Sequence, residues 1–65
     1  MNMYFTIGFF DKNGNTWTGA IWANTEREAR EKFKKYCPHF TINFVKKGLL
    51  SMDIIYISYD TEDNL

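Results

Sequence analysis

The spacing of apolar residues changes once in the N-terminal half of the chain, and the change separates two strands from a helix. Apolar and polar residues largely alternate through residues 3–23, which predicts two β-strands. From Thr25 onward the period is helical. Thr25 and Glu28 form a capping box, and Pro38 ends the helix because it restricts the preceding residue to extended conformations. The apolar stripe of this helix is Ala29, Phe33, Tyr36 and Cys37.

The turn between the two strands decides which side chains share a face. A two-residue loop at 13–14 would be a type I′ turn, whereas a three-residue loop at 12–14 would be a type I turn followed by a left-handed glycine. We predict the three-residue loop because it collects most of the apolar bulk on one face. The core face then holds Phe5, Ile7, Phe9, Trp17 and Ile21, and the opposite face holds Tyr4, Phe10 and Trp22.

Two further strands are expected in the C-terminal half. Residues 40–45 alternate in polarity, which places Phe40, Ile42 and Phe44 on one face of a half-buried strand. This strand is expected to end at a turn that begins with Lys46-Lys47. Residues 52–59 are apolar on both faces over their middle, which favours a position inside the sheet.

The predicted fold is therefore α+β with the element order ββαββ. It consists of a four-stranded, mainly antiparallel sheet with one helix packed on one face. Residues 1–59 are expected to form a single α+β domain, and residues 60–65 a flexible acidic C-terminal tail. Six Phe, four Tyr and two Trp give this 65-residue chain a core rich enough to need no disulfide or metal.

Composition also limits the cellular location and the classes of partner that we expect for this chain. The eight basic and eight acidic residues balance, whereas a protein that binds duplex nucleic acid through phosphates is usually basic. A lone cysteine and the absence of a secretory or membrane-spanning apolar run favour a cytoplasmic protein. No cofactor, metal or small-molecule ligand is inferred, and no membrane association is expected.

Two local patterns invite a chemical interpretation, and neither supports it. Cys37-Pro38-His39 resembles a nucleophile and base, but Cys37 falls on the apolar stripe of the helix and Pro38 tends to hold the flanking side chains apart. The loop at 11–15 resembles the opening of an EF-hand calcium loop. Its glycine is at the fourth position instead of the sixth, and Trp22 stands where the bidentate Glu should be. We therefore expect no catalytic or metal-binding residues and no enzymatic activity.

The exposed aromatic residues are the best candidates for function. We expect Tyr4, Phe10 and Trp22 to bind a protein partner, a second copy of the chain, or both, because Trp and Tyr often anchor interfaces. The chain is accordingly predicted to be a small protein-binding adaptor or inhibitor. Its composition is also typical of small phage or mobile-element proteins, which would make a host complex such as a defence or nucleic-acid enzyme its target.

Binding of single-stranded nucleic acid is the alternative function. Bases would stack on the same aromatic residues, and Lys12, Lys46 and Lys47, in turns at the sheet edges, would contact phosphates. The basic residues of the helix would lie on the wrong side of the sheet to assist. They also alternate with Glu at i,i+4 spacing, as is typical of a solvated helix face.

Overall fold

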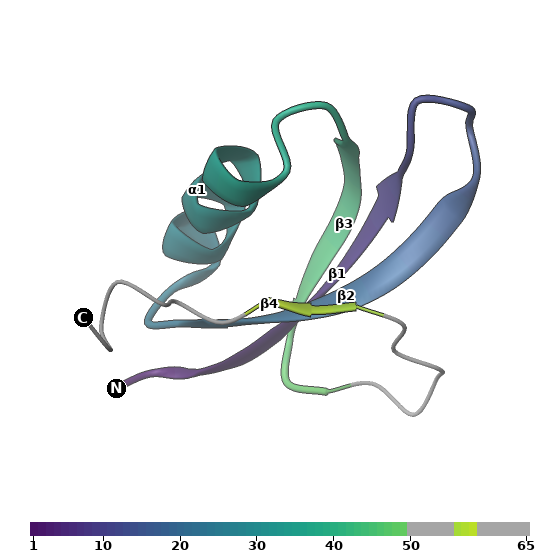
Figure 1. Ribbon diagram of the computed structural model, residues 1–65. Coiled ribbons are helices and arrows are strands. Elements are labelled where there is room, and N and C mark those ends of the chain that lie inside the picture. Colours follow the sequence, from purple (N-terminus) through teal and green to yellow (C-terminus); the bar gives the residue numbers. More distant parts are fainter. Residues whose placement is uncertain (50–55, 59–65) are drawn as a thin grey trace.

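The protein has an α+β fold in which one helix lies against one face of a sheet whose three longer strands are antiparallel (Figure 1). The computed structural model describes residues 1–49 and 56–58. The elements are β1 (Met3–Phe10), β2 (Thr16–Ala23), α1 (Glu26–Tyr36), β3 (Thr41–Lys47) and the short β4 (Tyr56–Ser58). The predicted class, the hairpin and the helix are confirmed, and the predicted acidic tail at 60–65 lies outside the described residues.

The strand order is β3-β1-β2-β4. Strand β1 pairs antiparallel with β2 and with β3, whereas β4 pairs parallel with Gly19–Ile21 of β2. The expected interior position of the last strand is wrong. Because β1 already has a neighbour on each side, β4 can pair only with an outer edge of the sheet, and it does so with that of β2. The rest of the strand predicted at 52–59 lies outside the described residues.

The hairpin turn has the predicted three-residue loop. Gly14 adopts a left-handed backbone with φ +84°, its N–H donates to the Asp11 carbonyl over 3.0 Å, and the Asp11 N–H donates to the Asn15 carbonyl over 2.9 Å. This geometry is a type I turn followed by a glycine bulge. The resulting register pairs Tyr4 with Trp22 and Phe9 with Trp17, as predicted.

The Asp11 carboxylate organises this turn. It accepts hydrogen bonds from the backbone N–H groups of Asn13 and Asn15, from the Asn15 side chain and from the Trp17 indole N–H, over 2.8–3.1 Å. The bond from Trp17 is the largest of the effects that lower the pKa of Asp11 from 3.8 to about 2. Both carboxylate oxygens are therefore engaged by the turn itself, which explains the calcium-loop resemblance without an ion.

Trp17 is not buried, although its register was predicted correctly. It is 37% exposed, nearly the same as the 38% of Trp22. The eleven-residue helix is about 16 Å long, whereas each eight-residue strand of the hairpin extends about 27 Å. The helix therefore cannot cover the whole hairpin, and the hairpin end projects beyond it (Figure 1). Trp17 pairs with Phe9, which the helix does cover, but its own side chain is outside the buried cluster and is bound by Asp11 of the turn.

The helix begins and ends where the sequence indicates. Thr25 is the N-cap, and its hydroxyl accepts a hydrogen bond from the Glu28 N–H over 3.1 Å. In a regular capping box the Glu28 carboxylate would accept from the N–H of the N-cap residue, Thr25. Here it accepts from the N–H of Asn24, one residue earlier. At the other end Cys37 is the C-cap, outside the helical conformation, and its N–H donates to the Phe33 carbonyl over 2.7 Å.

The core lies between the helix and one face of the sheet. Phe9 is at its centre, with ring centroids 4.9 Å from Phe33 of the helix and 5.3 Å from Phe40, onto which it stacks. Ala29 and Phe33 are the buried residues of the helix, and Cys37 packs against the core from its end. The buried apolar residues of this cluster are Phe5, Ile7, Phe9, Ile21, Ala23, Ala29, Phe33 and Val45.

A bulge in the β1–β3 pair overturns the predicted facing of β3. Gly8 pairs with Phe44 and Phe9 pairs with Ile42, so the register shifts between these two positions. Ile42 and Val45 consequently face the core, whereas Phe44 lies on the opposite face. The reason is Gly8: a Cβ built there would lie 2.1 Å from the Phe44 ring, so the ring occupies the space that a side chain would fill.

We predict that Gly8→Ala expels the Phe44 ring and destabilises the protein by about 1–3 kcal/mol, as overpacking usually does. Chemical denaturation of the variant measures the loss. Phe44→Ala is the matched background, because it removes the ring that the new methyl group would meet. If Gly8→Ala lowers the free energy of unfolding as much with Ala at position 44 as with Phe, the close approach of the Phe44 ring to Gly8 has no energetic role.

We predict that Asp11 stabilises the fold above about pH 4 and that this contribution falls as the pH approaches 2. The carboxylate has a lower pKa in the folded chain than the ordinary 3.8, so its ionised form favours folding and its protonation removes that preference. The difference in melting temperature between the wild type and Asp11→Asn should shrink between pH 5 and pH 2. An unchanged difference across this range would contradict the assignment.

Candidate functional site

The candidate site lies on the sheet face opposite the helix. Alternation along β1 and β2 and the bulge in β3 assign the side chains of this face, which we call the aromatic face. Its described members are Tyr4, Thr6, Gly8, Phe10, Thr16, Thr18, Ala20, Trp22, Thr41, Phe44 and Lys46. All three aromatic residues predicted from the sequence belong to it.

The structure brings together only two of the three predicted aromatic residues. The rings of Tyr4 and Trp22 meet edge to face, with centroids 4.8 Å apart and an interplanar angle of 66°. Phe10 is six residues further along β1 than Tyr4, about 20 Å away, and is half-buried beside the hairpin turn. The site is therefore a Tyr4–Trp22 pair with Phe10 as a separate, distal residue.

The middle of the aromatic face is closed. The side chains of Thr6 and Ala20, which pair across β1 and β2, are fully buried. The Thr6 hydroxyl donates to the Gly48 carbonyl over 2.6 Å, and the Gly48 N–H donates to the Tyr4 carbonyl over 2.8 Å. These bonds hold the end of β3 against β1. The accessible parts of the face lie to either side, at the flank that carries Tyr4 and Trp22, at Lys46, and at the hairpin end with Thr16 and Thr41.

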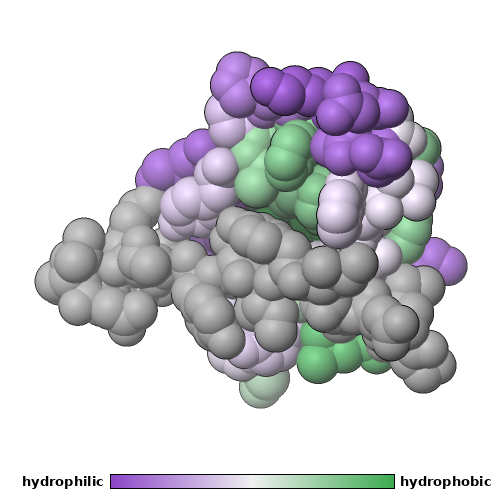
Figure 2. Space-filling view, turned by 45° about the vertical axis from the view of Figure 1, so that its right-hand side comes forward, coloured by the Kyte–Doolittle hydropathy of each residue, from purple (hydrophilic) through white to green (hydrophobic). Residues whose placement is uncertain are grey.

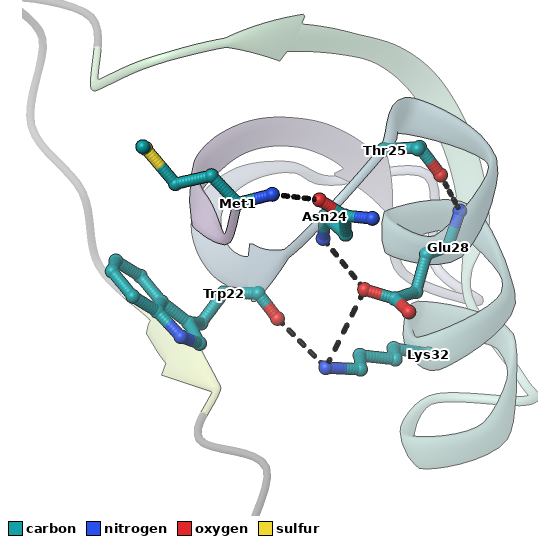
Figure 3. Close-up of polar contacts among 6 residues, drawn as sticks. All are labelled: Met1, Trp22, Asn24, Thr25, Glu28 and Lys32. Atoms are coloured by element: carbon teal, nitrogen blue, oxygen red, sulfur yellow. Dashed lines mark hydrogen bonds and ion pairs between the residues drawn. The ribbon is translucent and has the colours of Figure 1, made fainter.

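The helix holds the backbone of Trp22 in place. The Lys32 ammonium donates to the Trp22 carbonyl over 2.9 Å and lies 4.0 Å from the Glu28 carboxylate. Glu28 in turn accepts a hydrogen bond from the Asn24 N–H over 2.6 Å. The side chains of Lys32 and Glu28 therefore both bind the backbone at the end of β2. In Figure 3 the indole ring of Trp22 points away from this polar cluster. The ring is thus presented outward from a backbone that is held at two points.

Sequence reasoning missed two residues of this face. Phe44 was predicted on the core side of β3, and Lys46 was predicted in a turn at the sheet edge. Lys46 instead belongs to β3 and pairs with Thr6, which puts it on the same face as Tyr4. Gly8 was the only available signal, because a glycine inside a strand often marks a bulge or a close approach of another group.

The three lysines of the nucleic-acid alternative do not form one cluster. Lys12 lies in the hairpin loop, whereas Lys46 pairs with Thr6, about 20 Å away along β1. Lys47 is an exposed residue at the end of β3, next to Lys46. Lys46 and Lys47 are neighbours in β3, but their side chains alternate between the two faces of the sheet, so only Lys46 is on the aromatic face.

The cysteine and histidine show no catalytic arrangement. Cys37 is half-buried and packs against the core, and His39 is exposed. Within residues 1–49 and 56–58, no three His, Cys, Asp or Glu side chains gather as metal ligands would. In the same part of the chain, no helix has the length and apolar character to cross a membrane.

Apolar residues also reach the surface outside the aromatic face. Figure 2 shows hydrophobic surface below a hydrophilic upper rim. Among the described residues, Leu49 is 57% exposed just after the Gly48 turn. Trp17 lies on the helix side of β2, and its indole N–H is occupied by Asp11. Trp22 is therefore the large exposed aromatic residue on the aromatic face.

We predict that Lys32→Met lowers the free energy of unfolding by about 1–2 kcal/mol, because it removes a charged donor from the Trp22 carbonyl and keeps the aliphatic stem. The Lys32 side chain is only 18% exposed, so water cannot fully replace the lost contact. Lys34→Met is the control. Lys34 is exposed on the same helix, and its substitution should change stability by no more than about 0.5 kcal/mol. Equal effects of the two variants in chemical denaturation would show that the Lys32 contact contributes nothing specific.

No protein-family model, curated protein or solved structure matches this chain. The features that bear on function are therefore those of the described residues themselves. They are the edge-to-face pair of Tyr4 and Trp22, the Lys32 contact that fixes the Trp22 backbone, and the placement of Phe44 and Lys46 on the same face.

Proposed function

We propose that this chain is a small, non-enzymatic protein-binding module that uses its aromatic face. The proposal rests on one observation, the partial exposure of a Trp22 side chain whose ring and backbone are both in contact with other residues. Its ring is 38% exposed, it rests on Tyr4, and its backbone is bound by Lys32. Trp and Tyr are the side chains that most often dominate binding energy at protein interfaces. A ring already held in place also loses little conformational freedom on binding.

The partner is a second copy of the chain or another protein. Self-association would pair this flank with its own copy about a twofold axis, which is the commonest arrangement of small oligomers. A heterologous partner would make the chain an adaptor or an inhibitor. An origin in a phage or mobile element, with a host complex as the target, is one form of that proposal and rests on composition alone.

Single-stranded nucleic acid is the alternative ligand, and one observation favours it. Lys46 lies on the same face as the aromatic residues, so a phosphate and a base could be bound together. The burial of Thr6 and Ala20 in the middle of the face argues against nucleic-acid binding. Thr6 and Ala20 separate the Tyr4–Trp22 pair from Phe10, so successive bases have no continuous row of rings on which to stack. Protein binding is therefore the better supported function.

The two tryptophans provide a matched test. They share a strand and an exposed fraction, but only Trp22 is on the aromatic face. We expect Trp22→Ala to remain folded and to weaken dimerisation or partner binding by about 2 kcal/mol or more. Trp17→Ala should leave association unchanged, although it removes the indole bond to Asp11.

Sedimentation over a range of concentrations measures self-association of both variants and of the wild type. If the wild type is monomeric, capture of partners from cells of the source organism follows, with the same two variants as baits. Loss of association in Trp17→Ala but not in Trp22→Ala would place the site on the helix side of the sheet and refute the proposal.

A further inference from the structure

The β3 bulge gives the aromatic face a charge as well as rings. Because the register shifts at Gly8, Lys46 projects to the side of the sheet that carries Tyr4 and Phe44. Lys46 is exposed, and the exposed Lys47 follows it. Among the described residues of the aromatic face, Lys46 is the only charged side chain. The described part of the face is therefore apolar at Trp22 and basic at the end of β3.

We propose that the partner presents an acidic protein segment to this face. An apolar side chain of the segment would pack on the Tyr4–Trp22 pair, and a carboxylate would pair with Lys46. This inference rests on the proposed function and names the chemistry of its partner. Charge complementarity of this kind selects partners and sets their register more than it adds affinity.

The sheet geometry fixes the spacing that such a segment needs. Trp22 pairs with Tyr4 and Lys46 pairs with Thr6, so the two residues are two strands apart and offset by two positions. With about 4.8 Å between strands and about 3.3 Å per residue, their Cα atoms are about 12 Å apart. An extended partner segment covers that distance in about four residues. The carboxylate should therefore follow or precede the apolar anchor by three or four positions.

A protein carboxylate fits this surface better than a nucleic-acid backbone does. Phosphates recur along a single strand, and binding proteins follow them with a groove of positive charge. Here Lys46 lies at one end of the face, Lys12 is about 20 Å away, and the chain has no net charge. An isolated carboxylate requires no more than this one cation.

A series of soluble peptides tests the proposal directly. Each peptide has ten residues, with one Trp or Leu anchor and with Glu, Gln or Lys at the third and fourth positions from that anchor. The nucleic-acid probe is an oligo-dT of ten nucleotides. Binding is followed by the NMR signal of the Trp22 indole N–H. We expect the Glu peptides to bind up to about five-fold more tightly than the Gln peptides, as one exposed ion pair with Lys46 would allow, and the Lys peptides to bind least.

Two charge-reversal variants assign the effect to the face. Lys46→Glu should abolish the preference for Glu over Gln, whereas Lys34→Glu, the same change on the exposed side of the helix, should preserve it. Equal binding of Glu and Gln peptides, an equal effect of both variants, or tighter binding of oligo-dT would overturn the proposal. If no peptide binds but Trp22→Ala still abolishes association, the acidic-partner inference fails and the protein-binding function stands. If Trp22→Ala has no effect either, both fail.

Discussion

The left-handed conformation of Gly14 is the constraint on which the rest of this structure depends. It sets the length of the hairpin loop, and the loop sets the register of β1 against β2. Side chains alternate between the faces of a strand, so a slip of one residue would exchange the core face and the aromatic face. The Asp11 carboxylate supports this one geometry by binding the N–H groups of Asn13 and Asn15. Asp11 and Gly14 thus decide that Trp22 faces away from the helix.

A second constraint is that a single short helix covers a longer hairpin. It buries the central part of one sheet face, around Phe9 and Phe33, and leaves the hairpin end uncovered. Trp17 pairs with Phe9, but its side chain lies outside the buried cluster, and its indole N–H donates to Asp11. The two tryptophans are therefore exposed for different reasons. Trp17 is on the helix side of the sheet and is bound to the hairpin turn, whereas Trp22 lies on the other face.

The parts of the fold that depend on nearby residues were predictable from the sequence. The turn follows from residues 11–15, the helix start from Thr25 and Glu28, and the hairpin register from the apolar pattern around that turn. The members of the aromatic face on β1 and β2 follow from the same register. In each case the signal and the structure it specifies are within a few residues of each other or are joined by one tight turn.

The parts that depend on distant residues were not predictable. The face of Phe44 is set by the missing side chain of Gly8, which is 36 positions away in the chain, and no pattern within β3 records it. The exposure of Trp17 depends on which part of the sheet face α1 covers, and the edge position of β4 follows from β3 having taken the other side of β1. Consequently Lys46 could not be placed beside the aromatic residues before the register of β3 was known.

The distribution of polar contacts explains why function is assigned to Trp22 and not to Trp17. The indole of Trp17 is part of the turn, since its N–H completes the Asp11 network. The contacts at Trp22 instead engage its backbone, through Lys32, and its ring, through Tyr4, on the face away from the core. In a domain this small, stability depends on burying apolar surface, so a large ring held firmly and left partly exposed is poorly explained by folding alone. Restraint without burial is the property that binding requires, because it lowers the entropic cost of association while keeping the apolar surface available to a partner.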